Sequence, residues 1–204
     1  MDIPRRSTIL ALMNWDRGAG VLPTTHRFMS ASEYYEMPEG PPYFQLIEGE
    51  LLLSPSPRFF HQRIVINLLV SIENFLRRHS LGKIMIAPSD VELDTKNVYQ
   101  PDLYFVSNSR SSLINKQGVK GAPDFVVEAI SASTGRLDLG PKKKIFARRG
   151  VREFWAVFPE SKEVKVWKLA ESVDDPVLHL KLGDSLSTEI LPGWKIMLEE
   201  IFAE

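Results

Sequence analysis

Two carboxylates interrupt apolar segments of the chain at positions where a strand would normally hold apolar side chains. Asp102 follows Pro101 and precedes an apolar run, and Glu128 lies inside residues 125–130, which are otherwise apolar. An unpaired carboxylate in an apolar interior is costly, so it takes up a proton or finds a cation. Carboxylates from two adjacent strands can share a divalent ion, and Mg²⁺ is typically held by one or two of them together with waters. Asp102 and Glu128 are therefore candidate metal ligands.

Structural roles compete with this interpretation. Asp102 can cap a turn after Pro101, and Glu128 can pair with an arginine in the folded chain. The metal-binding role is better supported for Glu128, because an unpaired charge deep in an apolar strand is so unfavourable.

Three further polar residues lie close to these segments. His61 opens a helical pattern and can orient a carboxylate or a phosphate, since helix N-termini favour anions; a structural hydrogen bond is the alternative. Asp124 precedes the apolar run and is either a turn residue or a support for the ligands. Ser131 follows the run and can donate to a phosphate or cap a turn.

Residues 61–78 give the strongest helical pattern that could position such groups. Their apolar side chains recur at helical spacing, and basic residues occupy the last turn, where cations favour the helix dipole. A second, shorter helix is predicted after Ser30, because Ser30 and Glu33 form a capping box, and it should end by residue 37.

The strands are predicted from alternating or continuous apolar runs. The apolar run at residues 125–130 is typical of a strand buried on both faces, in the middle of a sheet. Residues 142–149 should form a helix, with Pro141 in its first turn and Gly150 at its end. The remaining predicted strands are 43–53 with a turn at Glu48-Gly49, 83–87, 91–93, 98–106, 154–158, 164–169 and 178–182.

This order of elements indicates an α/β (α+β) fold with a central mixed sheet flanked by few helices. Residues 1–29 form an N-terminal arm, and residues 30–204 form one domain. The net charge of −1 means that a nucleic-acid partner would need a local basic patch or metal ions. The chain has no cysteine, which excludes thiolate chemistry and fits a cytoplasmic protein, and no run reaches the roughly 20 apolar residues of a membrane helix.

Several short motifs together carry a resemblance to a known family. They are Leu46-Ile47-Glu48-Gly49-Glu50-Leu51, Ser54-Pro55 with His61, Gln100-Pro101-Asp102-Leu103, residues 121–131, Ser133-Thr134 with Asp138, residues 142–151, Glu153-Phe154-Trp155 and Leu191-Pro192-Gly193. In this order and spacing they resemble the Uma2 (DUF820) family over about residues 30–202. The resemblance implies a restriction-endonuclease-like fold of the PD-(D/E)XK type.

By this resemblance, Asp102 is the motif aspartate and Glu128 the acidic residue of the second half-motif. The usual lysine position two residues later holds Ile130, and the family pattern has a lysine at the position of Lys142 instead. Lys142 would then be the catalytic cation, with Lys143 and Lys144 as rivals and a solvated helix face as the alternative for all three. Glu50 is a candidate third acidic ligand or an ordinary hairpin residue. Gln45 departs from the glutamate that the family often has.

The function that this implies is Mg²⁺- or Mn²⁺-dependent hydrolysis of phosphodiester bonds, with DNA the expected substrate and a homodimer one possible assembly. In this hypothesis the metal activates a water and no nucleophilic side chain is needed. A non-catalytic nucleic-acid-binding or interaction module on the same scaffold is the alternative, because a fold does not guarantee a function. A metal hydrolase with another substrate is a third possibility.

Overall fold

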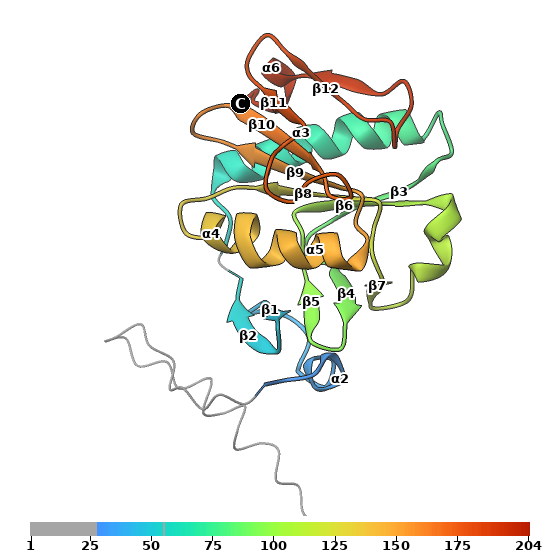
Figure 1. The fold of residues 1–204 in the computed structure, drawn as a ribbon, viewed down its shortest axis with the longest axis vertical. Helices are drawn as coiled ribbons and strands as arrows, with labels where there is room; N and C mark the ends of the chain where they lie inside the picture. Colours follow the sequence, from blue (N-terminus) through green and yellow to red (C-terminus); the bar gives the residue numbers. More distant parts are fainter. Residues whose placement is uncertain (1–27, 55) are drawn as a thin grey trace, which may run out of the picture.

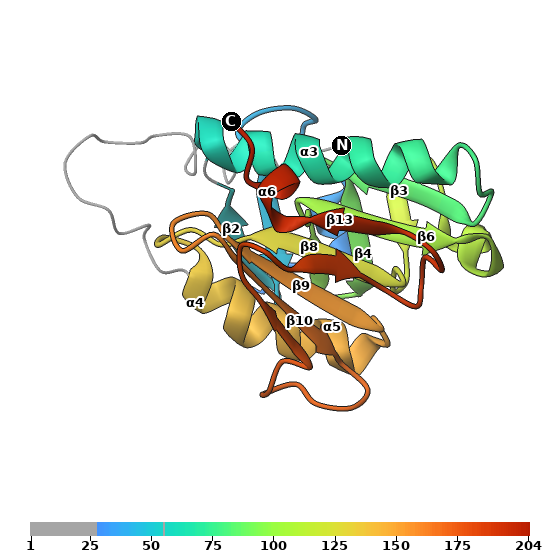
Figure 2. The ribbon, with the colours of Figure 1, turned by 90° about the horizontal axis from the view of Figure 1, so that it is seen from above.

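A long helix, α3 (Phe59–Leu76), lies across one face of a six-stranded sheet (Figure 2). The computed structural model describes residues 28–54 and 56–204, so the predicted arm falls outside the described residues except for its last two. Within the described ranges, no helix is both long and apolar enough to cross a membrane.

Strand β8 lies inside the six-stranded sheet, whose order is β11-β10-β9-β8-β6-β3. β8 pairs in parallel with β9 and antiparallel with β6, so the sheet is mixed. All five residues of β8 are buried, which confirms the predicted interior strand. The strands are β3 (Gly82–Ile86), β6 (Leu103–Ser107), β8 (Phe125–Ala129), β9 (Glu153–Phe158), β10 (Glu163–Lys168) and β11 (Leu178–Leu180).

A second sheet of five strands, in the order β2-β1-β5-β4-β7, lies beside the first among the described residues (Figure 1). Its strands are β1 (Phe44–Ile47), β2 (Glu50–Leu53), β4 (Asp90–Asp94), β5 (Asn97–Tyr99) and β7 (Gly118–Lys120). The predicted turn joins β1 to β2, with Glu48 and Gly49 both at positive φ, the conformation of a two-residue hairpin turn.

Short elements complete the described fold. The predicted capping box begins helix α2 (Ala31–Tyr34), where Ser30 and Glu33 bond reciprocally. A 3₁₀ helix (Asn108–Leu113) follows β6, and a small sheet of β12 (Ser185–Ser187) and β13 (Lys195–Met197) precedes helix α6 (Leu198–Ile201).

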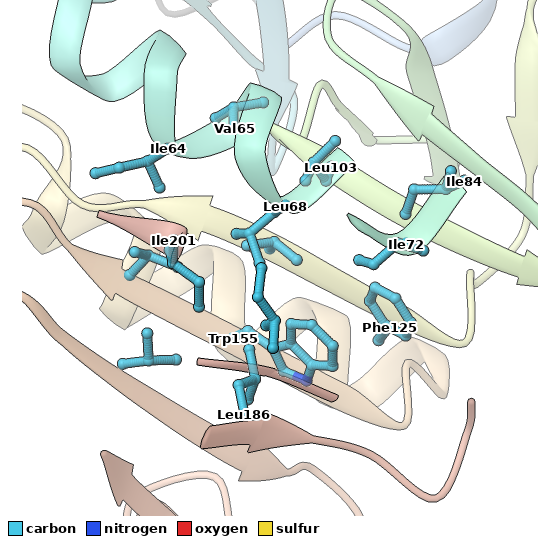
Figure 3. Close-up of a cluster of buried hydrophobic side chains, with 14 of the residues drawn as sticks. Ile64, Val65, Leu68, Ile72, Ile84, Leu103, Phe125, Trp155, Leu186 and Ile201 are labelled. Atoms are coloured by element: carbon cyan, nitrogen blue, oxygen red, sulfur yellow. The ribbon is translucent and has the colours of Figure 1, made fainter. Parts of the chain in front are cut away.

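Alternate residues of β8 face two separate apolar cores. Phe125, Val127 and Ala129 pack with α3, and Figure 3 shows Ile64, Leu68 and Ile72 of that helix facing Phe125 and Trp155 of the sheet. Val126 packs on the other face, with side chains of the helix at residues 143–149 and of the five-stranded sheet. Because side chains alternate along a strand, Glu128 belongs to this second face.

One predicted strand is wrong as a single element. Residues 98–106 form two strands in different sheets, because the chain leaves the five-stranded sheet after β5 and enters the six-stranded sheet at β6. Pro101 lies in the break, where its missing N–H cannot contribute to a ladder.

The predicted helix 142–149 begins earlier than expected. A helical turn, α4 (Gly135–Leu137), leads into a π-helical turn (Asp138–Lys142), which continues as α5 (Lys143–Arg149). Pro141 therefore lies within the π turn and not at a helix start. Its ring clashes with an ordinary α-helical turn and its nitrogen donates no bond, so a wider turn accommodates it. Gly150, in the left-handed region, ends the helix as predicted.

The packing of α3 on the sheet makes a direct prediction for stability. Leu68 is fully buried and Val70, two residues on in the same helix, is 51% exposed. Leu68→Ala should lower the free energy of unfolding by about 2–5 kcal/mol, because it leaves a cavity in the core. Val70→Ala, the control, should change it by about 0.5 kcal/mol or less. Urea denaturation measures both, and equal effects would contradict this assignment of the core.

Candidate active site

Asp102 and Glu128 lie side by side at adjacent ends of β6 and β8. In the antiparallel pairing of β6 with β8, Leu103 is opposite Val127. If the same register is continued by one residue, Asp102 is opposite Glu128. Directly opposed residues of antiparallel strands have their side chains on the same face. The backbone N–H of Asp102 faces Glu128 Oε2 at 3.5 Å, and the N–H of Ala129 donates to Asp102 Oδ2 at 2.7 Å.

His61 brings the first turn of α3 to the same place. Its Nε2 lies 3.0 Å from Asp102 Oδ1, so both oxygens of Asp102 are oriented, one by the ring and one by the backbone of β8. Burial lowers the pKa of His61, but the hydrogen bond and charge of Asp102 outweigh it and raise the pKa. The side chains of His61 and Asp102 are 17% and 21% exposed, and they form the accessible side of the site.

Lys142 lies on the buried side of the candidate site. Its Nζ donates to Glu128 Oε1 at 2.6 Å and to Asp138 Oδ1 at 2.8 Å. The side chain of Lys142 is only 2% exposed, and those of Glu128 and Asp138 are each 6% exposed. The ammonium is therefore enclosed between two carboxylates, one from β8 and one from the π turn.

The electrostatics of this group favour a second cation. Burial raises the pKa of Glu128 to about 8; the Lys142 ammonium opposes the shift, and the charges of Asp138 and Asp102 add to it. Burial lowers the pKa of Lys142, but its two carboxylate partners outweigh burial and raise the pKa above its ordinary value. The Lys142 ammonium therefore compensates the charge of Glu128 only in part, and a bound cation would favour the ionised form of Glu128.

The three consecutive lysines lie in different surroundings. Only Lys142 contacts the carboxylates, whereas Lys143 places its Nζ 4.1 Å from the centre of the Trp167 ring. Lys144 is exposed. Among the three lysines, Lys142 is therefore the one that lies beside the carboxylates, whereas Lys143 packs on an aromatic ring and Lys144 faces solvent.

Other predicted site residues lie apart from this group. Glu50 is exposed at the start of β2, opposite Ile47. Asp124 precedes β8 at its far end, where it accepts from the N–H of Ser107 and pairs with Arg110 and Arg152. Ser131 is two residues past β8 and bonds to the hydroxyls of Ser133 and Thr134.

The donor set fits a divalent ion that is held by few protein ligands. Within residues 28–54 and 56–204, no three His, Asp or Glu side chains gather in an arrangement suited to a metal ion. Asp102 and Glu128 nevertheless present adjacent carboxylates, and Glu128 Oε2 has only the long 3.5 Å contact with a backbone N–H. Hard oxygen ligands in this number match the preference of Mg²⁺, which keeps several waters.

Asp138 is the residue of this group to which sequence reasoning gave no role. Its spacing of four residues from Lys142 is the signal that could have identified it, because such pairs meet along a helix. The predicted start of the helix at residue 142 concealed this spacing.

Removal of the ammonium tests how strongly the buried charges depend on it. Lys142→Met leaves Glu128 and Asp138 buried without their cation, and should lower the free energy of unfolding by about 3–5 kcal/mol above about pH 8, where Glu128 is ionised. The loss should shrink as the pH falls through about 8, because the raised folded pKa of Glu128 lets it take up a proton there. Lys144→Met, at the exposed neighbour, should be close to neutral. Urea denaturation at several pH values decides this, and similar effects of both substitutions would refute it.

Comparisons with known proteins bear on the family and the fold of the chain. A family model described as "Uma2: Putative restriction endonuclease" matches residues 31–199. A crystal structure of "a putative nuclease belonging to DUF820" from Anabaena variabilis superposes with a TM-score of 0.73 at 15% identity, covering 86% of this chain and 98% of that one. Among curated proteins, none matches the chain. The likeness in structure confirms the predicted mixed α/β fold, and the match to the family model shows that the chain belongs to the Uma2 family.

Proposed function

We propose that this chain is a metal-dependent endonuclease that hydrolyses phosphodiester bonds, with DNA the expected substrate. The observation that supports this most is the meeting of Asp102, Glu128 and Lys142, which come from three separate segments of the chain. Membership of a family described as restriction endonucleases points to the same class of reaction.

In this proposal Asp102 and Glu128 hold Mg²⁺ or Mn²⁺. When bound, such an ion polarises a phosphoryl oxygen and lowers the pKa of a water. His61 and the N–H of Ala129 fix the orientation of Asp102. Lys142 keeps its charge beside Glu128 and offsets negative charge that develops on the phosphate, an effect that is strong where water is excluded.

Two further elements belong to the proposal. A homodimer would present two sites, one for each strand of a duplex. A cytoplasmic location is consistent with a sequence that has no cysteine.

A non-catalytic nucleic-acid-binding module is the second candidate, and one observation favours it. The Lys142 ammonium already pairs with Glu128 at 2.6 Å in a buried environment, as in a structural ion pair. In that case the chain would retain the scaffold and bind nucleic acid without cutting it.

Nicking assays distinguish these candidates. The purified chain should convert supercoiled plasmid to the open-circular form with Mg²⁺ or Mn²⁺ and not with EDTA; single-stranded DNA and RNA serve as parallel substrates. Asp102→Asn and Glu128→Gln should each lower the rate about a hundredfold or more, because each removes a group that acts on the reacting centre. Glu153→Gln is the matched control, since Glu153 is also buried but bonds to Trp155 and Thr188, outside the site. Binding of nucleic acid without any cleavage, in every metal, would favour the module.

The predicted role of Glu50 has its own test. If Glu50 is a third ligand, Glu50→Ala should weaken Mn²⁺ binding roughly tenfold or more, within the range for loss of a group that supports a metal site. If Asp102 and Glu128 suffice, as the exposed position of Glu50 suggests, calorimetry should give the same Mn²⁺ affinity with and without the substitution.

A further inference from the structure

The ammonium of Lys142 bonds to two carboxylates, and only Glu128 belongs to the proposed metal-binding pair. We propose that Asp138 is a positioning residue that holds Lys142, and so keeps one oxygen of Glu128 directed toward Asp102. This inference rests on the proposed function, because it concerns how Glu128 stays available to a metal ion.

The two carboxylate oxygens of Glu128 have different hydrogen-bond partners. Oε1 accepts from Lys142 at 2.6 Å, and Oε2 faces the backbone N–H of Asp102 at 3.5 Å. An ammonium has three N–H donors, so without another acceptor Lys142 could engage both oxygens of Glu128. The bond from Lys142 to Asp138 Oδ1, at 2.8 Å, occupies one donor and holds Nζ on the helix side of Glu128.

Burial makes this arrangement specific. The side chain of Lys142 is 2% exposed, so water has little access to replace a lost acceptor. A buried donor without a partner is costly, and a charged donor more so. Lys142 without Asp138 would therefore turn further toward Glu128, which is the other carboxylate within its reach.

The π turn sets the position of Asp138. It spans Asp138–Lys142, so the carboxylate and the ammonium come from its two ends. Wide turns of this kind are rare and occur frequently at functional sites. Here the turn delivers both partners into the apolar face that also contains Glu128.

The consequence is a competition at Glu128 between Lys142 and a metal ion. Asp138 weakens the hold of Lys142 on Glu128, and it keeps the ammonium paired when Glu128 turns to a metal. Asp138 thus raises metal affinity through Lys142, without being a ligand itself.

A double-mutant cycle tests this on the full-length chain. Calorimetry measures the Mn²⁺ affinity of wild type, Asp138→Leu, Lys142→Met and the double variant. Asp138→Leu removes the acceptor at nearly constant volume, and should weaken Mn²⁺ binding roughly tenfold, the equivalent of one charge-assisted hydrogen bond. In the Lys142→Met background the same substitution should change the affinity less than about twofold, because Asp138 then has nothing to hold. Glu153→Gln, at a buried carboxylate outside the site, should leave the affinity unchanged.

Two outcomes of the cycle would overturn the proposal. An equal loss in both backgrounds would mean that Asp138 acts by its charge alone, and no loss in the wild-type background would mean that it does not position Glu128.

Crystal structures of metal-free wild type and Asp138→Leu give a test that needs neither Mn²⁺ nor a Lys142 variant. In Asp138→Leu, Lys142 Nζ should contact both oxygens of Glu128; an unmoved Nζ would contradict the inference. This comparison remains decisive if Lys142→Met does not fold. It also separates the two proposals, because wild type that binds no Mn²⁺ would end the metal-dependent function and leave the positioning role to be judged by the structures.

Discussion

The arrangement of this site depends on a single buried ammonium, that of Lys142. It lies between Glu128 and Asp138 on a face of the sheet that is otherwise apolar, and Asp102 is adjacent. Charges can be buried in such surroundings only when they are paired. Burial raises the pKa of Glu128 most, and the nearby charges of Asp138 and Asp102 add to the shift. A divalent cation bound beside Glu128 would favour its ionised form, and hard oxygen ligands suit such an ion.

One of the passages of the chain between the two sheets brings Asp102 to this site. Between β5 and β6 the backbone crosses from one sheet to the other, and Asp102 lies at the end of that crossing. The segment is fixed by Gln100, whose side chain donates to Asp90 at 2.9 Å and whose N–H donates to the side chain of Gln45 at 3.2 Å. The side-chain amide of Gln45 also donates to Ser54, so it acts as both donor and acceptor. An ionised glutamate at this position could accept but not donate.

Local signals in the sequence were sufficient for much of this structure. The continuous apolar run around Glu128 predicted an interior strand, and the capping box at Ser30 predicted where α2 begins, because both depend on neighbouring residues alone. The face on which Glu128 lies also followed from strand alternation. The adjacency of Asp102 and Glu128 was a hypothesis until the strand register was known, since pairing depends on residues far apart in the chain.

Two predicted elements are wrong in their bounds, and each has a physical cause. Pro101 breaks an apolar run into strands of different sheets, and apolar periodicity does not reveal which sheet a strand joins. A proline such as Pro141 is typical of a helix start, but here it lies within a π turn, and the predicted helix therefore leaves Asp138 without a role. The role of Glu50 stays a prediction, and Glu50 is exposed at the start of a hairpin strand.

The most direct measurement for the central claim is a crystal structure of the chain soaked in Mn²⁺, with the ion located by its anomalous scattering. The account predicts one ion in contact with the carboxylates of Asp102 and Glu128, while Lys142 remains bonded to Asp138. An anomalous peak elsewhere, or no peak while Lys142 still pairs with Glu128 at saturating Mn²⁺, would contradict it.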